Sequence, residues 1–462
     1  MNADPATEDE VRIMSVGSIG AGFSYRAFKR GLEWNPHVVA SDAGSADHGA
    51  ASLGTGAVRS RGPMKKQLDT LITGARSIGA KFIIGSAGTA GGERNLQAVR
   101  EIVEEIAQER DLHFRMALLH AELDKDFLKA KRAANKIVPL GPFPELTDEQ
   151  IDESYPIVGM MGAEPFLKAL DLGADVILGG RATDPAIFAG PPLRAGIPPG
   201  LAWHAARTMD KGVMMTVPGE ETGSLGFIHF RKDHFVASST KEGTYCTPRS
   251  VAAVTLYEND SPYHTIVPSG VIDTSDCTYE ALDGGRVKVT GSKFQPASKY
   301  TVKLEGARFV GYRALAFVAT RDPMLIPQVD DWLSRVRINA ERNLHLQGVE
   351  KDDYTVRFRV YGKNGVMGDD EPIKETASHE LGILIDAIGT TQEAALEAAG
   401  RHKALAGHTK FPGQLNHANT AEPFAMGAVP LGEVYDWGVW HIVELDHWND
   451  WEDLFHVEIV DL

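Results

Sequence analysis

Residues able to move protons, bind anions or attack carbonyl groups follow several short apolar segments in the first part of the chain. They are Ser18, Asp42, Ser45, Asp47, His48, Ser86, His120, Glu122, Asp124, Arg181 and Asp184. If the apolar segments are parallel strands, their carboxyl ends meet at one edge of a sheet, where open α/β sheets bind ligands. Asp and Ser also cap helices that follow strands, which is the structural alternative for any single loop. Taken together, these residues predict a functional rim.

The densest titratable group is His120-Ala121-Glu122-Leu123-Asp124. A histidine flanked by carboxylates can act as a general base whose tautomer is fixed by a neighbour. His120 could instead ligate a metal with Asp42 or Asp47, or make structural hydrogen bonds. No His-x-x-x-His or Cys-x-x-Cys spacing is present, so a divalent metal stays an open question. As catalytic candidates we name Asp42, Asp47, His48, His120 and Glu122.

Glycine-rich loops offer backbone N–H groups to an anion at helix starts. The run over residues 17–22 has the spacing Gly-x-x-Gly-x-Gly, which is not the dinucleotide pattern, and no Walker loop is present, so the sequence carries no nicotinamide or ATP signature. Tight turns are the alternative role of these loops. Arg181 follows two glycines and could hold a carboxylate at two points, or pair with Asp184. The candidate substrate-binding residues are Ser18, Gly20, Ser45, Ser86, Gly88, Arg181, Asp184 and Cys246.

A nucleophilic mechanism is the second chemical hypothesis. Ser18, Ser86 or Cys246 would attack the substrate in a hydrolase. The chain has no Gly-x-Ser-x-Gly motif, and no neighbour visibly activates Cys246, so this hypothesis ranks below proton-transfer chemistry.

The elements that must position these residues alternate between strand and helix. Strands are expected at 12–16, 38–41, 81–84, 114–119 and 175–178, and helices at 25–34, 63–78, 96–109, 127–134 and 164–172. Such alternation predicts a mostly parallel, doubly wound α/β sheet over residues 1–225. Residues 226–306 are expected to form a β-rich linker or extension, with a strand at 250–256 and a hairpin turn at Asp283-Gly284-Gly285.

A second regular pattern begins near Arg308. Its order is strand 308–319, helix 324–344, strand 355–361, strand 381–388, helix 392–406 and strand 439–445. This βαββαβ order predicts a ferredoxin-like α+β domain over residues 307–462. Because that fold is a common assembly module, we expect a homo-oligomer, and a non-catalytic subunit is a third hypothesis.

Composition narrows the class of protein. The net charge of −16 argues against nucleic-acid and anionic-membrane partners, although a local cleft can still bind a small anion. Only two cysteines are present, no apolar run is long enough to span a membrane, and the acidic residues 1–10 do not form a signal peptide. These features predict a cytoplasmic protein.

Several of these motifs occur in a characteristic order, ending with the runs 159–166, 179–184, 246–248, 300–306 and 357–362. With them the chain resembles the acyclic terpene utilisation (AtuA) family over nearly its whole length. The resemblance implies a cytoplasmic catabolic protein of bacterial breakdown of branched acyclic terpenoid acids through CoA thioesters, with a small companion subunit. One departure concerns residues 45–49, where Ser-Ala-Asp-His-Gly replaces an expected Ser-Thr-Asp-Pro-Gly. His48 could add a proton-transfer group there.

These observations lead to one principal hypothesis. The protein is expected to act on a small branched or unsaturated carboxylate, or its CoA thioester, by hydratase, dehydratase or lyase chemistry. Arg181 and loop N–H groups would hold the anionic end, and His120, Asp42 or His48 would move the proton next to the carbonyl group.

Overall fold

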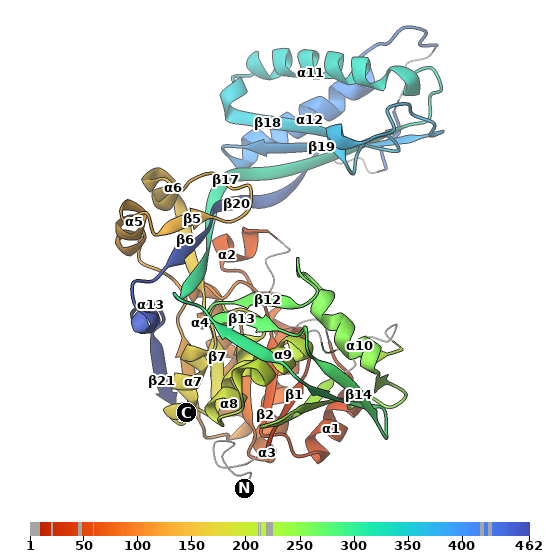
Figure 1. Cartoon of the computed structure of the whole chain (residues 1–462). Helices are drawn as coiled ribbons and strands as arrows, with labels where there is room; N and C mark the ends of the chain where they lie inside the picture. The colour runs from red at the N-terminus through yellow and green to blue at the C-terminus, as the bar shows by residue number, and fades with distance from the viewer. Residues whose placement is uncertain are drawn as a thin grey trace. The chain divides into compact units, whose positions relative to one another are not determined.

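The chain folds into two compact units, which are described separately (Figure 1). The computed structural model describes residues 10–19, 22–44, 49–58, 60–210, 212, 214–218, 225–415, 420–423 and 427–462. Unit 1 comprises Met1–Arg308 and Trp437–Leu462, and unit 2 comprises Phe309–Asp436. Two long strands, β17 (Thr301–Thr320) and β20 (Val429–Glu444), contribute residues to both units. The three consecutive domains expected from the sequence stay a prediction.

Among the described residues, unit 1 contains a 10-stranded sheet. Its centre is parallel, in the order β1 (Glu10–Ser15), β2 (Val38–Asp42), β3 (Lys81–Gly85), β7 (Val176–Gly179) and β4 (Arg115–Leu119). Antiparallel strands extend both edges: β9 (Gly226–Arg231), β10 (Phe235–Ser239), β15 (Arg286–Thr290) and β14 (Thr278–Leu282) beside β1, and β21 (Val457–Asp461) beside β4. The expected mixed α/β class is confirmed.

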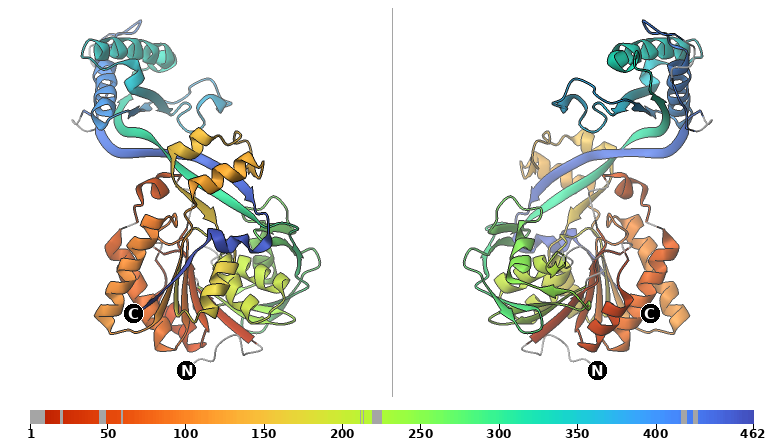
Figure 2. Two further views of the ribbon diagram at one scale, coloured as in Figure 1. Left: turned by 90° about the vertical axis from the view of Figure 1, so that its left-hand side faces the viewer. Right: turned by 90° about the vertical axis from the view of Figure 1, so that its right-hand side faces the viewer.

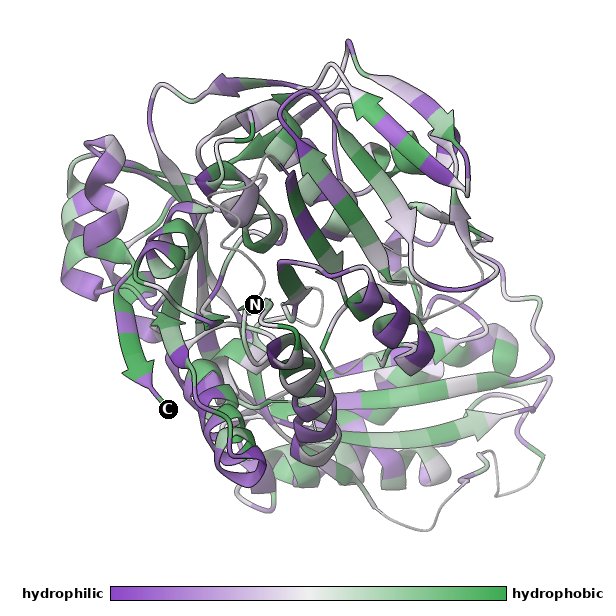
Figure 3. Cartoon of the chain, turned by 90° about the horizontal axis from the view of Figure 1, so that it is seen from below, coloured by the Kyte–Doolittle hydropathy of each residue, from purple (hydrophilic) through white to green (hydrophobic). Residues whose placement is uncertain are grey.

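Helices cover both faces of this sheet (Figure 2). One face carries α1 (Tyr25–Glu33), α3 (Arg61–Ser77) and α4 (Glu93–Arg110), and the other carries α7 (Glu164–Asp171), α8 (Ala186–Arg194) and α9 (Pro199–Asp210). On the first face, Leu71 of α3 and Ile102 of α4 are fully buried against Phe82 of β3. Figure 3 shows the corresponding pattern of apolar strands and polar outer helix surfaces. Burial of this apolar layer drives the strands together and fixes their register.

Shorter elements complete unit 1. They are α2 (Ala51–Thr55), α5 (Lys125–Ala133), β5 (Ile137–Pro139), α6 (Asp148–Glu153), β6 (Ser154–Met160), β8 (Thr216–Val217), β11 (Tyr245–Cys246), α10 (Pro248–Ala253), β12 (His264–Val267), β13 (Gly270–Asp273), β16 (Lys293–Pro296) and α13 (Trp451–Leu454). Across the described parts of both units, every helix is too short or too polar to cross a lipid bilayer.

The prediction of a strand at residues 250–256 is wrong. This segment forms the last turn of α10 and a 3₁₀ turn over Val254–Leu256. The helix begins because Thr247 Oγ1 accepts the Ser250 backbone N–H at 3.0 Å while Ser250 Oγ accepts that of Thr247 at 2.9 Å. This reciprocal cap, followed by Pro248 at the first helical position, outweighs the strand preference of the valines. The hairpin expected at Asp283–Gly285 is confirmed, since this turn joins β14 to β15.

Unit 2 packs two helices against one side of a sheet. Its strands follow the order β18 (Tyr354–Tyr361), β19 (Leu381–Gly389), β17 and β20, and its helices are α11 (Val329–His345) and α12 (Gln392–His408). Trp332 of α11 is fully buried beside Ile383 of β19 and Ala398 of α12. Strand, helix, strand, strand, helix, strand is the element order that the sequence predicts for this part of the chain.

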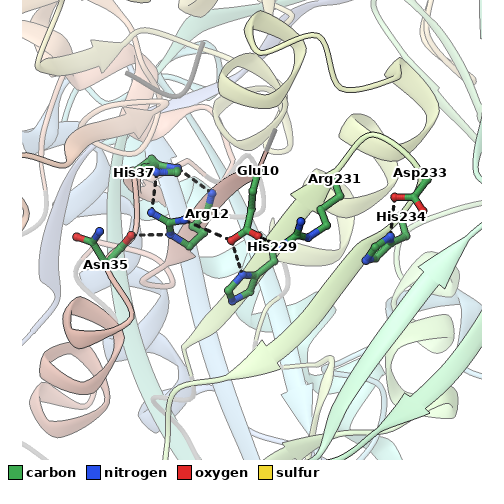
Figure 4. Close-up of polar contacts among 8 residues, drawn as sticks. All are labelled: Glu10, Arg12, Asn35, His37, His229, Arg231, Asp233 and His234. Atoms are coloured by element: carbon green, nitrogen blue, oxygen red, sulfur yellow. Dashed lines mark hydrogen bonds and ion pairs between the residues drawn. The ribbon is translucent and has the colours of Figure 1, made fainter. Parts of the chain in front are cut away.

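Polar clusters also occur where the parallel strands of unit 1 begin (Figure 4). Glu10, the first residue of β1, accepts from His229 Nδ1 at 3.0 Å and pairs with Arg231 of β9. Arg12 binds Glu10 at 3.3 Å and donates from Nε to the Asn35 carbonyl at 2.8 Å. This network joins β1 to its antiparallel neighbour at the edge opposite to the predicted rim. Polar side chains alone therefore do not identify the site.

Candidate functional site

Three carboxylates converge at the carboxyl edge of the parallel strands. Asp42 is the last residue of β2, Asp184 lies between β7 and α8, and Asp210 is the last residue of α9. One oxygen from each lies within 4.8 Å of the others. Strands β2 and β7 run parallel on either side of β3, so the sheet itself brings the loops after them to a common place. We call Asp42, Asp184 and Asp210 the acidic cluster.

Asp42 is the most enclosed member of the acidic cluster. Only 7% of the residue is exposed. Its Oδ2 accepts the Gly44 backbone N–H at 3.1 Å, whereas Oδ1 has no hydrogen-bond partner among the described residues. Burial, followed by repulsion from Asp184 and Asp210, raises the pKa of Asp42 well above its ordinary value. A buried carboxyl oxygen without a donor is unusual in folded proteins.

A buried ion pair supports the acidic cluster from the side. Arg181 Nε and Nη2 donate to the two oxygens of Glu305 at 2.8 and 3.1 Å, and Lys303 Nζ lies 2.9 Å from Glu305 Oε1. Burial alone would raise the pKa of Glu305, but Arg181 and Lys303 lower this pKa to about 2. Burial alone would also lower the pKa of Arg181, and the Glu305 charge holds that pKa above its ordinary value. Arg181 is thus a fixed positive charge beside Asp42.

Ser86 fixes the loop that carries Arg181. Its hydroxyl receives the Arg181 Nη1 and Ala182 N–H groups and donates to the Ala182 carbonyl, each at 3.2 Å. The residue is fully buried and has a positive φ of 49°. With every hydrogen-bonding position occupied and no exposure, the Ser86 hydroxyl holds structure together in this state. Gly88 lies in the same turn, and its carbonyl accepts a hydrogen bond from Asn95 Nδ2 at 3.1 Å.

A polar pocket adjoins the acidic cluster. It has a volume of about 410 Å³, and its walls include Thr183, Pro185, Arg207, Asn259, His264 and Thr265. Thr183 and Pro185 are the chain neighbours of Asp184, and Arg207 Nη1 lies 3.1 Å from Asp210 Oδ2. The other Arg207 amino group donates to the Tyr257 carbonyl, while Nε has no acceptor within the described part of the chain. We call this cavity the Arg207 pocket.

His120 and Glu122 lie in a second cluster on the same edge. His120 Nδ1 is 2.8 Å from Glu93 and its Nε2 is 3.3 Å from Glu458, and the ring stacks on His456. Glu122 accepts the Glu93 backbone N–H at 2.7 Å, and burial raises its pKa. Strands β3 and β7 separate β4 from β2, which places the ends of β2 and β4 roughly 14 Å apart. The sheet therefore groups Asp42 with Arg181 rather than with His120.

The remaining predicted residues have different positions. Ser18 is exposed after β1. Cys246 is 3% exposed, and burial raises the pKa of its thiol to about 12, so it stays protonated at neutral pH. Gly20, Ser45, Asp47 and His48 lie outside the described residues.

Four residues of the site were not among the candidates from the sequence: Lys303, Glu305, Arg207 and Asp210. A signal existed for Asp210. The carboxyl end of a helix carries partial negative charge, so an acidic last residue is unfavourable unless a cation compensates it. The sequence carried no such signal for Glu305, because Val302 and Leu304 alternate with Lys303 and Glu305, a pattern that predicts an exposed glutamate, whereas the structure buries it.

Comparisons with known proteins give one clear result. The model of the "Acyclic terpene utilisation family protein AtuA" matches residues 63–194 and 229–430, which is most of the chain. A search among curated proteins found no match. A solved structure, the UDP-N-acetylglucosamine 3-dehydrogenase GnnA from Acidithiobacillus ferrooxidans, aligns with 62% of this chain and 84% of its own at 9% identity and a TM-score of 0.11. At that TM-score the likeness carries no argument.

Proposed function

Because the chain belongs to the acyclic terpene utilisation protein AtuA family, which implies a role in acyclic terpene utilisation, we propose that it is a catabolic enzyme for a small branched or unsaturated carboxylate or its CoA thioester. The proposed reaction is addition of water to a conjugated double bond, or the reverse elimination. The acidic cluster is the proposed reaction centre, and the Arg207 pocket is the proposed place of the substrate.

The observation that carries this proposal is the position of the acidic cluster beside the Arg207 pocket. Three ionised carboxylates whose oxygens lie within 4.8 Å of one another repel each other and lower the stability of the fold. Stability alone therefore does not account for their presence. Such groups persist at sites where they act on a ligand. The wall of the Arg207 pocket contains Thr183 and Pro185, the chain neighbours of Asp184, and Arg207, which binds Asp210, so a small molecule there lies close to the acidic cluster.

The Arg207 pocket fits the proposed substrate in size, and its wall holds Arg207 together with the acidic Glu258 and Asp260. Its volume of about 410 Å³ is within the range of small-molecule sites. Arg207 places a guanidinium group in the pocket wall, and a guanidinium group can donate to a substrate carboxylate or thioester carbonyl oxygen. The hydroxyl groups of Thr183 and Thr265 supply further neutral donors, and Ile266 and Val267 supply apolar surface, which suits an oxygen-rich group next to an apolar chain.

The proposed hydration adds one molecule of water across the conjugated double bond. Water forms a C–O bond at the β-carbon while the carbon–carbon π bond breaks, and its electrons pass into the carbonyl group. One proton of water stays on the new hydroxyl group, the other passes to a base at the acidic cluster, and the α-carbon takes up one proton, so the substrate gains one water and no proton is released overall. The negative charge that develops on the carbonyl oxygen in between requires a positive partner. Arg207 is the positively charged side chain that lines this pocket in the described structure.

The test is turnover of a panel of branched α,β-unsaturated acids and their CoA thioesters. Hydration would add the mass of one water and remove the ultraviolet absorbance of the conjugated thioester. We expect Asp42→Asn to lower kcat/KM by roughly 100-fold or more. Asp175→Asn is the matched control, because Asp175 precedes β7 at the opposite end of the sheet and binds Lys81 at 3.0 Å. Full activity in Asp42→Asn, or no turnover of any panel member by the wild-type protein, would refute the proposal.

We also propose a ferredoxin-like fold for unit 2 and a doubly wound sheet for unit 1. The order β18-β19-β17-β20 with α11 and α12 on one side supports a ferredoxin-like assignment for unit 2. The parallel strands of unit 1 with helices on both faces support a doubly wound arrangement.

A further inference from the structure

We propose that Asp42, Asp184 and Asp210 bind one hard divalent cation of the Mg²⁺, Mn²⁺ or Ca²⁺ type through three carboxylate oxygens. This inference concerns the same site as the proposed function and deepens it by naming a ligand. Its evidence is the geometry and charge of the acidic cluster, so it can be tested without a substrate.

The spacing of the oxygens matches a shared cation. Around a metal with oxygen ligands at about 2.1 Å, adjacent oxygens lie about 3.0 Å apart and opposite ones about 4.2 Å. With ligands at about 2.4 Å these separations become about 3.4 and 4.8 Å. The three carboxylate oxygens all lie within 4.8 Å of one another, so one ion can contact them with little rearrangement.

The ligand atoms are held in place before any ion binds. Asp42 ends a central strand, and its Oδ2 is fixed by the Gly44 N–H. Asp210 is oriented by Arg207 at 3.1 Å. Asp42 Oδ1 is the second, independent indication, because this oxygen is enclosed at a residue that is 93% buried and has no donor among the residues described. A carboxylate oxygen in that position is stabilised by a cation that takes the place of the missing donor.

The local charge favours a cation. When all are ionised, the acids Asp42, Asp184, Asp210 and Glu305 outnumber the bases Arg181, Arg207 and Lys303 by one. Arg181 and Lys303 are both engaged by Glu305, so they compensate the cluster only in part. The carboxyl end of α9, at Asp210, adds partial negative charge. Oxygen-only donors select a hard cation over a thiolate- or imidazole-preferring one.

A cation here would explain how the site handles an anionic substrate. It would change the local excess from one negative to one positive charge, which suits a single carboxylate or a developing enolate. Three protein ligands leave further coordination positions of a six-coordinate ion for water or a substrate oxygen. Thr183, the chain neighbour of Asp184, and Arg207, which binds Asp210, line the Arg207 pocket, where such a substrate would lie.

The experiment is a titration of chelator-treated full-length protein with Mn²⁺, followed by electron paramagnetic resonance, and with Mg²⁺ and Ca²⁺, followed by calorimetry. We expect one ion per chain. Each of Asp42→Asn, Asp184→Asn and Asp210→Asn should weaken binding at least tenfold, and Asp175→Asn should bind like the wild type. Absence of binding to the wild type at millimolar ion, or binding by all three cluster variants as tight as that of the wild type, would overturn the proposal.

Thermal unfolding, measured with and without ion, gives a second test that does not depend on the binding titration. The wild-type thermal midpoint should rise with added ion, because a ligand of the folded state stabilises it. Without ion, Asp42→Asn should melt higher than the wild type, since it relieves repulsion in the cluster, and added ion should not shift it. If Asp42→Asn has a lower thermal midpoint than the wild type without ion, the carboxylates do not repel one another as the cation site requires. Ion binding without turnover would refute the proposed function alone, and turnover that survives chelation without ion binding would refute the cation site alone.

Discussion

Arg181 and Glu305 form a two-point ion pair in the interior of unit 1, although 124 residues separate them in the chain. Nε and Nη2 of the arginine meet Oε2 and Oε1 of the glutamate at 2.8 and 3.1 Å, and each side chain is at least 94% buried. The pair joins the loop after β7 to β17 beside Asp42. Breaking it should therefore affect both stability and the site.

Glu305→Gln should lower the free energy of unfolding by about 3–5 kcal/mol at neutral pH, because it leaves Arg181 buried without its countercharge. Urea denaturation measures the change. Glu444→Gln is the matched control, since Glu444 binds Lys136 at the surface and its loss should change stability far less. A similar loss in both variants would contradict the role assigned to the buried pair.

The same pair should make stability depend on pH in acid. The pKa of Glu305 falls from its ordinary 4.5 to about 2 in the folded protein, so its contribution is fully present above pH 4.5 and is lost between pH 4.5 and 2. A shift of this size corresponds to about 3 kcal/mol. The difference in unfolding free energy between the wild type and Glu305→Gln should shrink over that range. A constant difference would show that Glu305 does not titrate this way.

His204 should also make stability depend on pH, in a range above that of Glu305. Burial lowers the pKa of this fully enclosed imidazole from 6.5 to about 4, and its Nδ1 meets Ser292 Oγ at 2.8 Å. Above pH 6.5 the folded and unfolded histidine are both neutral. Between pH 6.5 and 4 the unfolded state alone gains the proton, so stability falls as acid is added. His204→Asn should flatten the dependence of the thermal midpoint on pH in this window, and an unchanged slope would refute the assignment.

Gly91→Ala should destabilise unit 1 and disturb the Arg181 loop. Gly91 has a φ of +66°, and an added Cβ would overlap the backbone of Gly180 and Arg181. Gly141→Ala is the control, because Gly141 has a φ of +65° with no atom within 4 Å of its added Cβ. The control should cost about 1 kcal/mol, the conformational term alone. Gly91→Ala should cost more in denaturant unfolding, and equal losses would show that the contact with the Arg181 loop is unimportant.

Arg207→Lys should separate substrate binding from chemistry in the proposed reaction. Lysine keeps the charge near Asp210 but removes the Nε donor and the fork that also reaches Tyr257. We expect KM for the proposed substrate to rise roughly tenfold with a smaller change in kcat, which corresponds to about 1.4 kcal/mol of binding. A large fall in kcat with unchanged KM would place Arg207 in the chemical step instead.

The sequence by itself determined the local elements and the family. Alternating apolar segments and glycine turns predicted β1 to β4 and their helices closely, because periodicity and turn chemistry are local properties. It also named Asp42, Asp184, Arg181 and Ser86, which follow strands. It failed at residues 250–256, where the Thr247 and Ser250 cap makes a helix out of a β-branched stretch.

Only the tertiary structure decided which of the strand-end residues meet. The strand order places β3 and β7 between β2 and β4, so Asp42 joins Arg181 and Asp184 whereas His120 joins Glu93 and Glu458. Asp210 and Glu305 enter the site from α9 and β17, far along the chain. Strand order and long-range packing arise from burial of whole apolar faces, which no short stretch of sequence encodes.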